Sequence, residues 1–301
     1  MKVILDEEGK GEVLLDRDYR RRFISFLKDV FAAAGREVYE RLYNSRIPGG
    51  ADGKRLLPPR KPFTFSVYLG KAFRTIEGSD YLLTSLPYEF LFSTGDPLIA
   101  SHFYNGVLRL RSNGYSLNLS SITKAQPLHL KVGEITLARE EVIKSRAVLF
   151  KTKQPVIITA PKEPLKKEEG EEGYYVVPGD DGWEEILRQR LFEDYRRTKG
   201  KELKGDLRFK EVKNPLAMEI LSRWGKLDKT FVQKPIKTTR IKHYGVHALR
   251  GFKGVFLLCG PVELLQFVYQ YGMGVRTGQG FGMLDVLAQL KEEVCLEKKE
   301  N

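Results

Sequence analysis

The chain has 301 residues, 42% of them hydrophobic and 30% charged, which is enough for one large domain or two of about 150 residues. Lys and Arg outnumber Asp and Glu by 51 to 39, which gives a formal net charge of +12 and an isoelectric point near 9.5. The positive net charge favours a polyanionic partner, either a nucleic acid or an anionic membrane surface. No apolar stretch is long enough to cross a membrane, so a membrane-spanning protein is excluded.

The cysteine usage predicts a protein of a reducing compartment. Cys259 and Cys295 form neither a C-x-x-C pair nor a zinc-type cluster. Cys259 lies in an apolar run, which predicts a buried free thiol. The N-terminus carries acidic residues and lacks the apolar core of a signal peptide. We therefore expect a cytoplasmic protein with no metal site and no cofactor.

The first half of the chain predicts the element order β-α-β-β-α-β. A strand at 2–5 is followed by a helix that starts at Asp16 and ends near Gly35, with phenylalanines at helical spacing. Alternating strands follow at 62–69 and 81–92, and Gly95-Asp96-Pro97 opens a second helix. Residues 107–119 alternate again, and Asn113-Gly114 predicts a hairpin turn. This order is typical of a ferredoxin-like domain.

The second half predicts a degenerate copy of the first. Strands at 144–160, a helix at 183–199, a strand at 254–258, a helix after Gly260-Pro261 and a strand at 281–290 follow one another. Segments 90–110 and 256–275 share one plan: strand, helix start, helix, then glycine and a strand. The pattern predicts an α+β protein of two tandem ferredoxin-like (RRM-like) domains, at 1–122 and 123–301.

A glycine-rich loop, YGMGVRTGQGFGML, lies close to the C-terminus. Its glycines are Gly272, Gly274, Gly278, Gly280 and Gly282, and Arg276, Thr277 and Gln279 stand between them. Exposed backbone amides together with a cation suit contacts with phosphate groups. The spacing matches neither a dinucleotide fingerprint nor a P-loop. The structural alternative is a helix C-cap at Gly272 followed by a bulged turn, which accounts for one or two of the glycines.

The segment 251–286 resembles the C-terminal region of the CRISPR repeat-processing endoribonucleases of the RAMP superfamily. The glycine-rich loop carries most of this resemblance, and PFTFS at 62–66 and the helix WEEILRQRLFEDY from Trp183 support it. The resemblance implies two tandem ferredoxin-like domains and CRISPR repeat RNA, in a precursor transcript, as the partner. It leaves open association with subunits of a CRISPR effector complex, and a homodimer.

Two basic stretches that contain no acid, 54–74 and 229–253, favour a shared RNA surface, although each could also be a solvated face. The expected RNA-binding residues are Arg60, Lys61, Lys237, Arg240, Lys242, His243, Gly272, Gly274, Arg276, Thr277, Gln279, Gly280 and Gly282. Phe63 and Phe65 could stack on bases but are more typical of a core.

The resemblance also implies a metal-independent cleavage in which the RNA 2′-hydroxyl attacks the adjacent phosphate. The general base frequent in the family is a histidine between the first helix and the PFTFS strand, and residues 36–61 contain none. We expect Tyr43 or Lys54 to replace it, assisted by Arg46, with neighbouring cations lowering the pKa of either group. A histidine from elsewhere, such as His243, is one alternative. Another is a protein that binds repeat RNA without cleaving it, alone or as a RAMP subunit of an effector complex.

Overall fold

A computed structural model describes residues 1–44, 60–123, 127–160, 175–212, 237–243 and 247–295. The chain divides into two compact units. The first unit comprises Met1–Arg139, Lys242–His247 and Gly278–Gly280, and the second comprises the remaining segments. Each unit is described by itself below.

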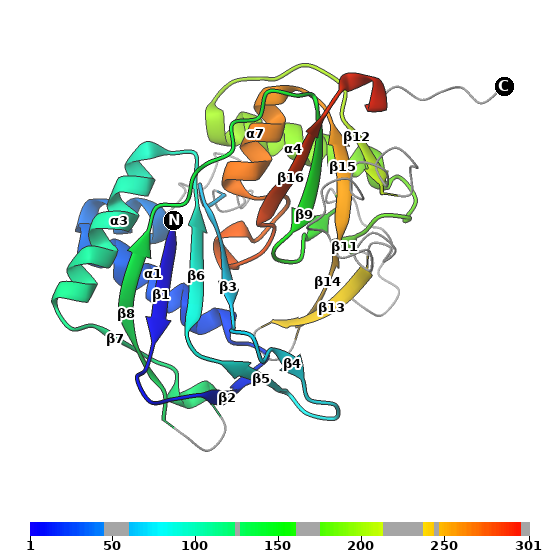
Figure 1. The fold of residues 1–301 in the computed structure, drawn as a ribbon. Helices are drawn as coiled ribbons and strands as arrows, with labels where there is room; N and C mark the ends of the chain where they lie inside the picture. The colour runs from blue at the N-terminus through cyan, green and yellow to red at the C-terminus, as the bar shows by residue number, and fades with distance from the viewer. Residues whose placement is uncertain (45–59, 124–126, 161–174, 213–236, 244–246, 296–301) are drawn as a thin grey trace, which may run out of the picture. The chain divides into compact units, whose positions relative to one another are not determined.

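The first unit is built on an antiparallel sheet with the strand order β3-β6-β1-β8-β7 (Figure 1). Its strands are β1 (Lys2–Asp6), β3 (Thr64–Tyr68), β6 (Tyr88–Ser93), β7 (Ser116–Asn118) and β8 (His129–Thr136). Between β1 and β3 runs helix α1 (Arg20–Ala34), and between β6 and β8 runs α3 (Pro97–Ser112). Without the short edge strand β7, this is the antiparallel order of a ferredoxin-like fold.

Phenylalanines dominate the core of the first unit. Alternate residues of β1 and β6 turn inward, so that Val3 pairs with Phe90 beneath the helices. Phe92 of β6 stacks on Phe103 of α3 with ring centroids 4.0 Å apart. Gly106 lets α3 approach α1 closely, because a Cβ there would lie 2.1 Å from the carbonyl oxygen of Val30.

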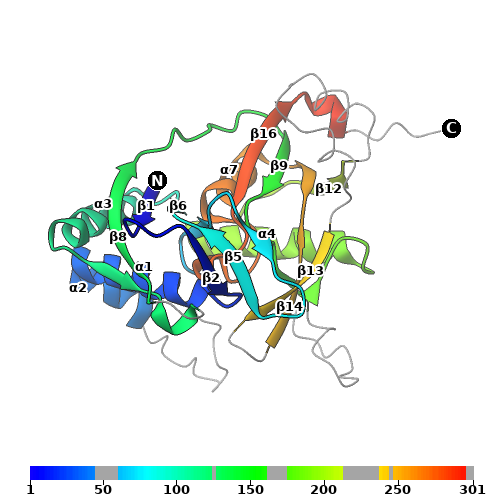
Figure 2. The ribbon, with the colours of Figure 1, turned by 60° about the horizontal axis from the view of Figure 1, so that its bottom comes forward.

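Smaller elements surround this sheet. The strands β2 (Glu12–Asp16), β5 (Tyr81–Ser85) and β4 (Arg74–Thr75) form a second sheet, and Figure 2 shows β2 and β5 side by side. After α1, the chain continues as the short helix α2 (Arg36–Tyr39) and a π-helical turn at Glu40–Asn44. This turn carries one of the predicted site residues.

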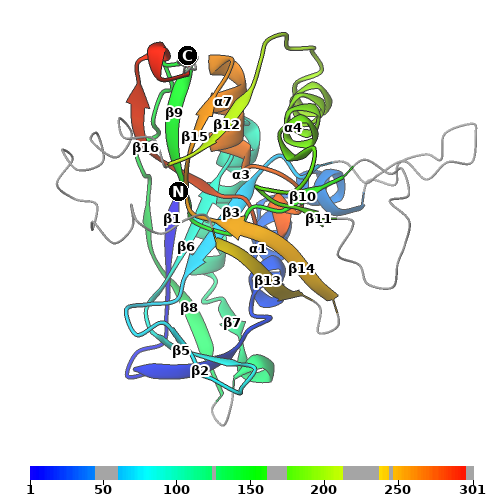
Figure 3. The ribbon, with the colours of Figure 1, turned by 90° about the vertical axis from the view of Figure 1, so that its right-hand side faces the viewer.

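The second unit repeats the same strand order. Its main sheet runs β12-β15-β9-β16, with β12 (Arg208–Glu211), β15 (Val255–Cys259), β9 (Ala147–Thr152) and β16 (Leu284–Leu290). Figure 3 shows α4 (Trp183–Lys199) and α7 (Val262–Tyr271) on one side of it. Two-stranded sheets join β10 (Ile158–Thr159) to β11 (Tyr175–Val176), and β13 (Lys237–His243) to β14 (His247–Lys253). The duplication predicted from the sequence, two tandem ferredoxin-like folds, is confirmed.

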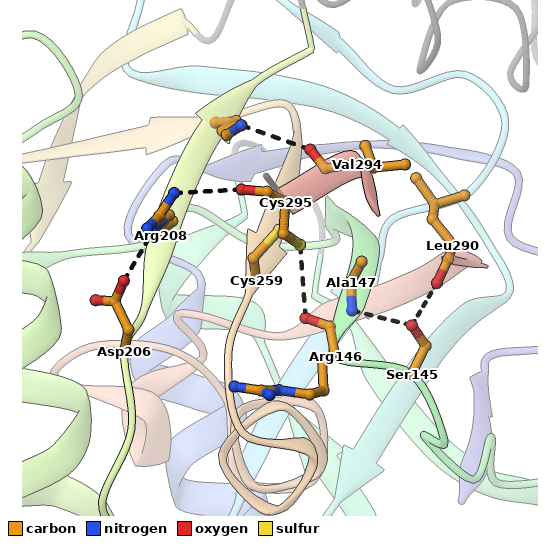
Figure 4. Close-up of a disulfide and its surroundings, with 10 residues drawn as sticks. Ser145, Arg146, Ala147, Asp206, Arg208, Cys259, Leu290, Val294 and Cys295 are labelled. Carbon is orange, nitrogen blue, oxygen red and sulfur yellow. Dashed lines mark hydrogen bonds and ion pairs between the residues drawn. A yellow bond between two sulfur atoms is a disulfide. The ribbon is translucent and has the colours of Figure 1, made fainter. Parts of the chain in front are cut away.

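The prediction of a free Cys259 thiol is wrong, because Cys259 and Cys295 form a disulfide (Figure 4). Cys295 belongs to a short 3₁₀ turn, Glu292–Cys295, which covers the sheet face opposite the helices. There Val294 packs with Ala147, Leu149 and Leu257, and Arg208 donates to the Cys295 carbonyl. The prediction that Cys259 is buried among apolar residues is confirmed. Its partner lies 36 residues away and is brought close only by this fold.

Three predicted boundaries differ from the structure. The hairpin at Asn113-Gly114 is wrong, because residues up to Ser112 are helical and Asn113 caps α3. The helix predicted from Asp16 starts at Arg20, since Asp16 ends β2. The first unit runs to Arg139 rather than to residue 122, because β8 pairs with β1 and closes the first sheet. Among the described residues, no helix is long and apolar enough to cross a membrane.

Candidate functional site

The structure describes only part of the predicted site. Arg46 and Lys54 lie outside the described residues. Lys237, Arg240, Lys242 and His243 fall on β13, for which the backbone alone is described. The site is therefore built from Tyr43, the segment before β3 and the glycine-rich loop.

Strand β3 holds the segment before it firmly in place. Phe63 and Phe65 are fully buried, as expected for core residues, and contact Phe92 and Phe90 with ring centroids 5.4 and 5.1 Å apart. The Pro62 carbonyl accepts a hydrogen bond from Thr94 at 2.5 Å. Lys61 directly precedes Pro62 and Phe63, so these two anchored residues hold its backbone in position.

Tyr43 lies on the π-helical turn and packs between Phe31 and Tyr39, with ring centroids 6.4 and 5.3 Å away. Its hydroxyl is buried and has no hydrogen-bond partner among the described residues. Burial, and secondarily Tyr39, raise the pKa of this phenol well above its usual value. The expected lowering by neighbouring cations is thus wrong for Tyr43, because desolvation penalises the phenolate more than those cations stabilise it.

Lys61 shows the shift that was expected of a catalytic lysine. Its Nζ lies 4.5 Å from the centroid of the Tyr43 ring. Burial, followed by the positive charge of Lys28, lowers the pKa of Lys61 from 10.5 to about 8. A group that titrates near neutral pH can exchange a proton with a reacting atom in either direction.

Lys28 was not predicted as a site residue. It lies on α1, and its Nζ is 5.7 Å from the centroid of the same Tyr43 ring. Helical spacing marks Lys28 as exposed, which it is, but gives no hint of the Tyr43 ring fifteen positions later. Only the folded arrangement of α1 and the π-helical turn brings the two residues together.

Packing explains several of the loop glycines. Gly272 follows the last residue of α7 with a φ of 83°. A Cβ on Gly274, at φ 83°, would lie 2.2 Å from the Ile157 carbonyl oxygen, and one on Gly282, at φ 72°, would lie 2.1 Å from that of Met273. The amide of Val275 donates to the Ile157 carbonyl at 2.8 Å, which ties the loop to the residue before β10. These positions require glycine whether or not a phosphate binds.

The tip of the loop, Gly278–Gly280, belongs to the first unit and lies against the start of β3. A Cβ on Gly278 would be 2.5 Å from Cγ of Lys61, and one on Gly280 would be 2.8 Å from the Phe65 ring. The loop tip therefore covers the stem of the lysine whose pKa is lowered.

The side chains of the loop differ in their access to solvent. Thr277 is only 1% exposed, and its hydroxyl has no hydrogen-bond partner among the described residues. Gln279 is partly buried, whereas Arg276 is exposed and has a left-handed backbone with φ 61°. Arg276 is thus the predicted loop residue that presents a cation to solvent.

No group of three or more His, Cys, Asp and Glu side chains suited to a metal ion occurs within the described part of the chain. The chemistry available there consists of a lysine titrating near neutral pH, a buried phenol and surrounding cations.

Comparison with known proteins finds the same fold in solved structures. A Cas6-related protein from Pyrococcus furiosus has a TM-score of 0.66 at 18% identity, with 96% of this chain and 99% of that one covered. A RAMP protein described as binding different RNA substrates has a TM-score of 0.62 at 18% identity, covering 95% and 98%. A Cas6 product complex has a TM-score of 0.53 at 14% identity, covering 95% and 99%. These likenesses establish the fold.

The sequence of the second unit matches a known family. No curated protein matches the chain. Residues 138–286 match the family model described as CRISPR associated protein Cas6, C-terminal. The glycine-rich loop lies inside this match. The chain thus carries a Cas6 C-terminal domain at 138–286 and has the fold of solved Cas6 structures.

Proposed function

We propose that this protein binds CRISPR repeat RNA and cleaves the precursor transcript within repeats, without a metal ion. The 2′-oxygen attacks the adjacent phosphorus, the bond to the 5′-oxygen breaks, and a cyclic phosphate and a 5′-hydroxyl result. The family, the positive net charge and the solved Cas6 product complex support this proposal. The observation that carries it is a partly buried lysine, titrating near pH 8, beneath the loop that characterises the family.

Lys61 is the group that takes the 2′ proton. With a pKa of about 8, about one tenth of the molecules hold Lys61 as a neutral amine at pH 7. That fraction accepts the 2′ proton as the bond to phosphorus forms, and the leaving 5′-oxygen takes a proton from water. The ammonium formed on Lys61 then lies beside the phosphate, where it stabilises the developing negative charge.

Tyr43 acts on the reaction through Lys61. Its raised pKa keeps the phenol protonated, and its buried hydroxyl cannot reach a substrate, so it is a poor general base. The face of the ring instead holds the Lys61 ammonium by a cation–π contact. Lys54, from the segment that follows Tyr43, stays the alternative to Lys61 as the base, and Arg46 stays proposed as the cation that assists it.

RNA is held mainly through its phosphates. The proposed contacts are Arg60, the exposed Arg276, Gln279, the basic residues of β13 and the backbone amides of the glycine-rich loop. Each phosphate neutralised by a cation lowers the logarithm of affinity by about 0.7 per tenfold rise in salt for single-stranded RNA. Affinity should therefore fall steeply as salt rises.

A second candidate function is repeat-RNA binding without cleavage, alone or within an effector complex. Residues 36–61 lack a histidine, and one of the similar structures is described only as binding RNA. The two functions differ in whether the RNA backbone is broken.

Single-turnover incubation with the cognate repeat RNA in EDTA separates the two functions. We expect cleavage by the parent protein, loss of cleavage in Lys61→Met, and little change in Tyr43→Phe, which keeps the aromatic ring. A repeat with a 2′-deoxy nucleotide at the cut site should bind normally and stay intact. Full activity in Lys61→Met would remove Lys61 from the mechanism, and an inert parent protein would favour the binding function.

A further inference from the structure

We propose that Lys28 is the second cation of a phosphate site whose first cation is Lys61. The two ammonium groups, gathered around the ring of Tyr43, together hold one phosphodiester of the RNA backbone. Besides holding the phosphate, Lys28 acts on the chemistry through Lys61. The catalytic part of this inference rests on the proposed function, whereas the phosphate site does not.

The arrangement is built from three elements of the first unit. Lys28 comes from α1, Tyr43 from the π-helical turn and Lys61 from the segment before β3. The ammonium groups of Lys28 and Lys61 lie 5.7 and 4.5 Å from the centroid of the Tyr43 ring. Leu27 and Val30 of α1 are fully buried, so the backbone that carries Lys28 is held by the core. The exposed side chain of Lys28 leaves the site open to a large ligand.

Among the residues that the structure describes, no carboxylate pairs with either of these two cations. Asp29, the acid of α1, accepts a hydrogen bond from Tyr115 at 2.6 Å, and Glu40 of the π-helical turn pairs with Arg36 at 2.7 Å. Glu37 of α2 is exposed. Within the described residues, neither Lys28 nor Lys61 forms a salt bridge. Two neighbouring cations without an acid repel each other, and an anion bound between them relieves that repulsion.

The same repulsion lowers the pKa of Lys61. The charge of Lys28 is the second cause, after burial, that lowers the pKa of Lys61. Removing that charge should raise the pKa and leave less neutral amine at pH 7. Two further groups lie beside the site: Tyr39, which contacts Tyr43, and Arg60, which precedes Lys61 in the chain. They are unchanged in a Lys28 variant, so the variant isolates one charge.

The direct test follows the side-chain nitrogen of Lys61 by NMR in protein labelled with ¹⁵N-lysine. The compared proteins are the parent, Lys28→Gln, Lys28→Arg and Lys144→Gln, the last removing an exposed lysine of the second unit. We expect the titration midpoint of Lys61 to rise only in Lys28→Gln. The uncleavable 2′-deoxy repeat RNA should shift the signals of both Lys28 and Lys61 in the parent protein. An unchanged midpoint, or RNA that shifts neither signal, overturns the proposal.

The catalytic consequence is measured separately. At pH 7, Lys28→Gln should slow single-turnover cleavage by roughly three- to tenfold, with the loss recovered at higher pH and in Lys28→Arg. If the parent protein does not cleave but the Lys61 midpoint and the RNA-induced shifts behave as expected, the proposed function fails while the phosphate site stands. A loss of rate that is the same at every pH would exclude the action of Lys28 through Lys61.

Discussion

Replacing Gly274 with alanine tests whether the loop glycines serve the fold or the RNA. Gly274 has a φ of 83°, and a Cβ there would meet the Ile157 carbonyl oxygen at 2.2 Å. The same carbonyl accepts the hydrogen bond from Val275 that anchors the loop to the residue before β10. The substitution therefore strains the backbone and pushes the loop away from its anchor.

The expected loss of stability follows from these two effects. An alanine in the left-handed region costs about 1 kcal/mol. Weakening the hydrogen bond from Val275 to Ile157 and displacing the backbone adds roughly 1–3 kcal/mol. The free energy of unfolding should thus fall by about 2–4 kcal/mol, which lowers the melting temperature by roughly 5–10 °C for a unit of this size.

Gly200 supplies the matched control for a thermal unfolding assay. It has a φ of 69° at the end of α4, with nothing within 4 Å of a Cβ, so Gly200→Ala carries the backbone strain alone. Gly274→Ala should melt well below Gly200→Ala, whereas Arg276→Ala should weaken RNA binding. Equal melting temperatures for the two glycine variants would refute the packing argument.

Further predictions concern the core, the disulfide and pH. Gly106→Ala should lower the free energy of unfolding by roughly 1–3 kcal/mol in urea, although alanine favours helices, because its Cβ would meet the Val30 carbonyl at 2.1 Å; an increase would contradict this. Cys295→Ser removes the disulfide, which joins residues 36 positions apart, and should lower the free energy of unfolding by about 3–4 kcal/mol. Dithiothreitol should then have no further effect on the variant. The pKa of Lys61 falls from 10.5 to about 8 on folding, so between these two pH values the unfolded chain binds more protons than the folded one. The free energy of unfolding should therefore rise with pH across that interval, and this rise should be missing in Lys61→Met.

Local patterns predicted the two folds because each element carries its own periodicity. The inward residues of β1 and the phenylalanines of α1 repeat at strand and helix spacing, and both are buried as expected. The hairpin at Asn113-Gly114 failed because Leu108 and Leu110 alternate with arginines as in a strand, whereas Val107 and Leu110 share one face of a helix. In the structure they are buried on a helix that ends at Ser112.

The site was harder to predict because its residues meet only in the folded chain. Tyr43 was chosen from its place in the chain, and its burial reversed the expected direction of its pKa shift. Lys61 was expected to bind RNA, but its lowered pKa depends on burial and on Lys28, neither of which is visible in a basic segment. The disulfide was missed for the same reason, since a turn near the C-terminus brings Cys295 to β15.

The pH dependence of repeat cleavage in EDTA tests the central claim most directly. Single-turnover rates should rise about tenfold per pH unit below the pKa of the base and level off above it. With Lys61 as the base, the bend lies near pH 8 in the parent protein and is absent in Lys61→Met. A strict need for a divalent metal, or the same profile in both proteins, would contradict the account.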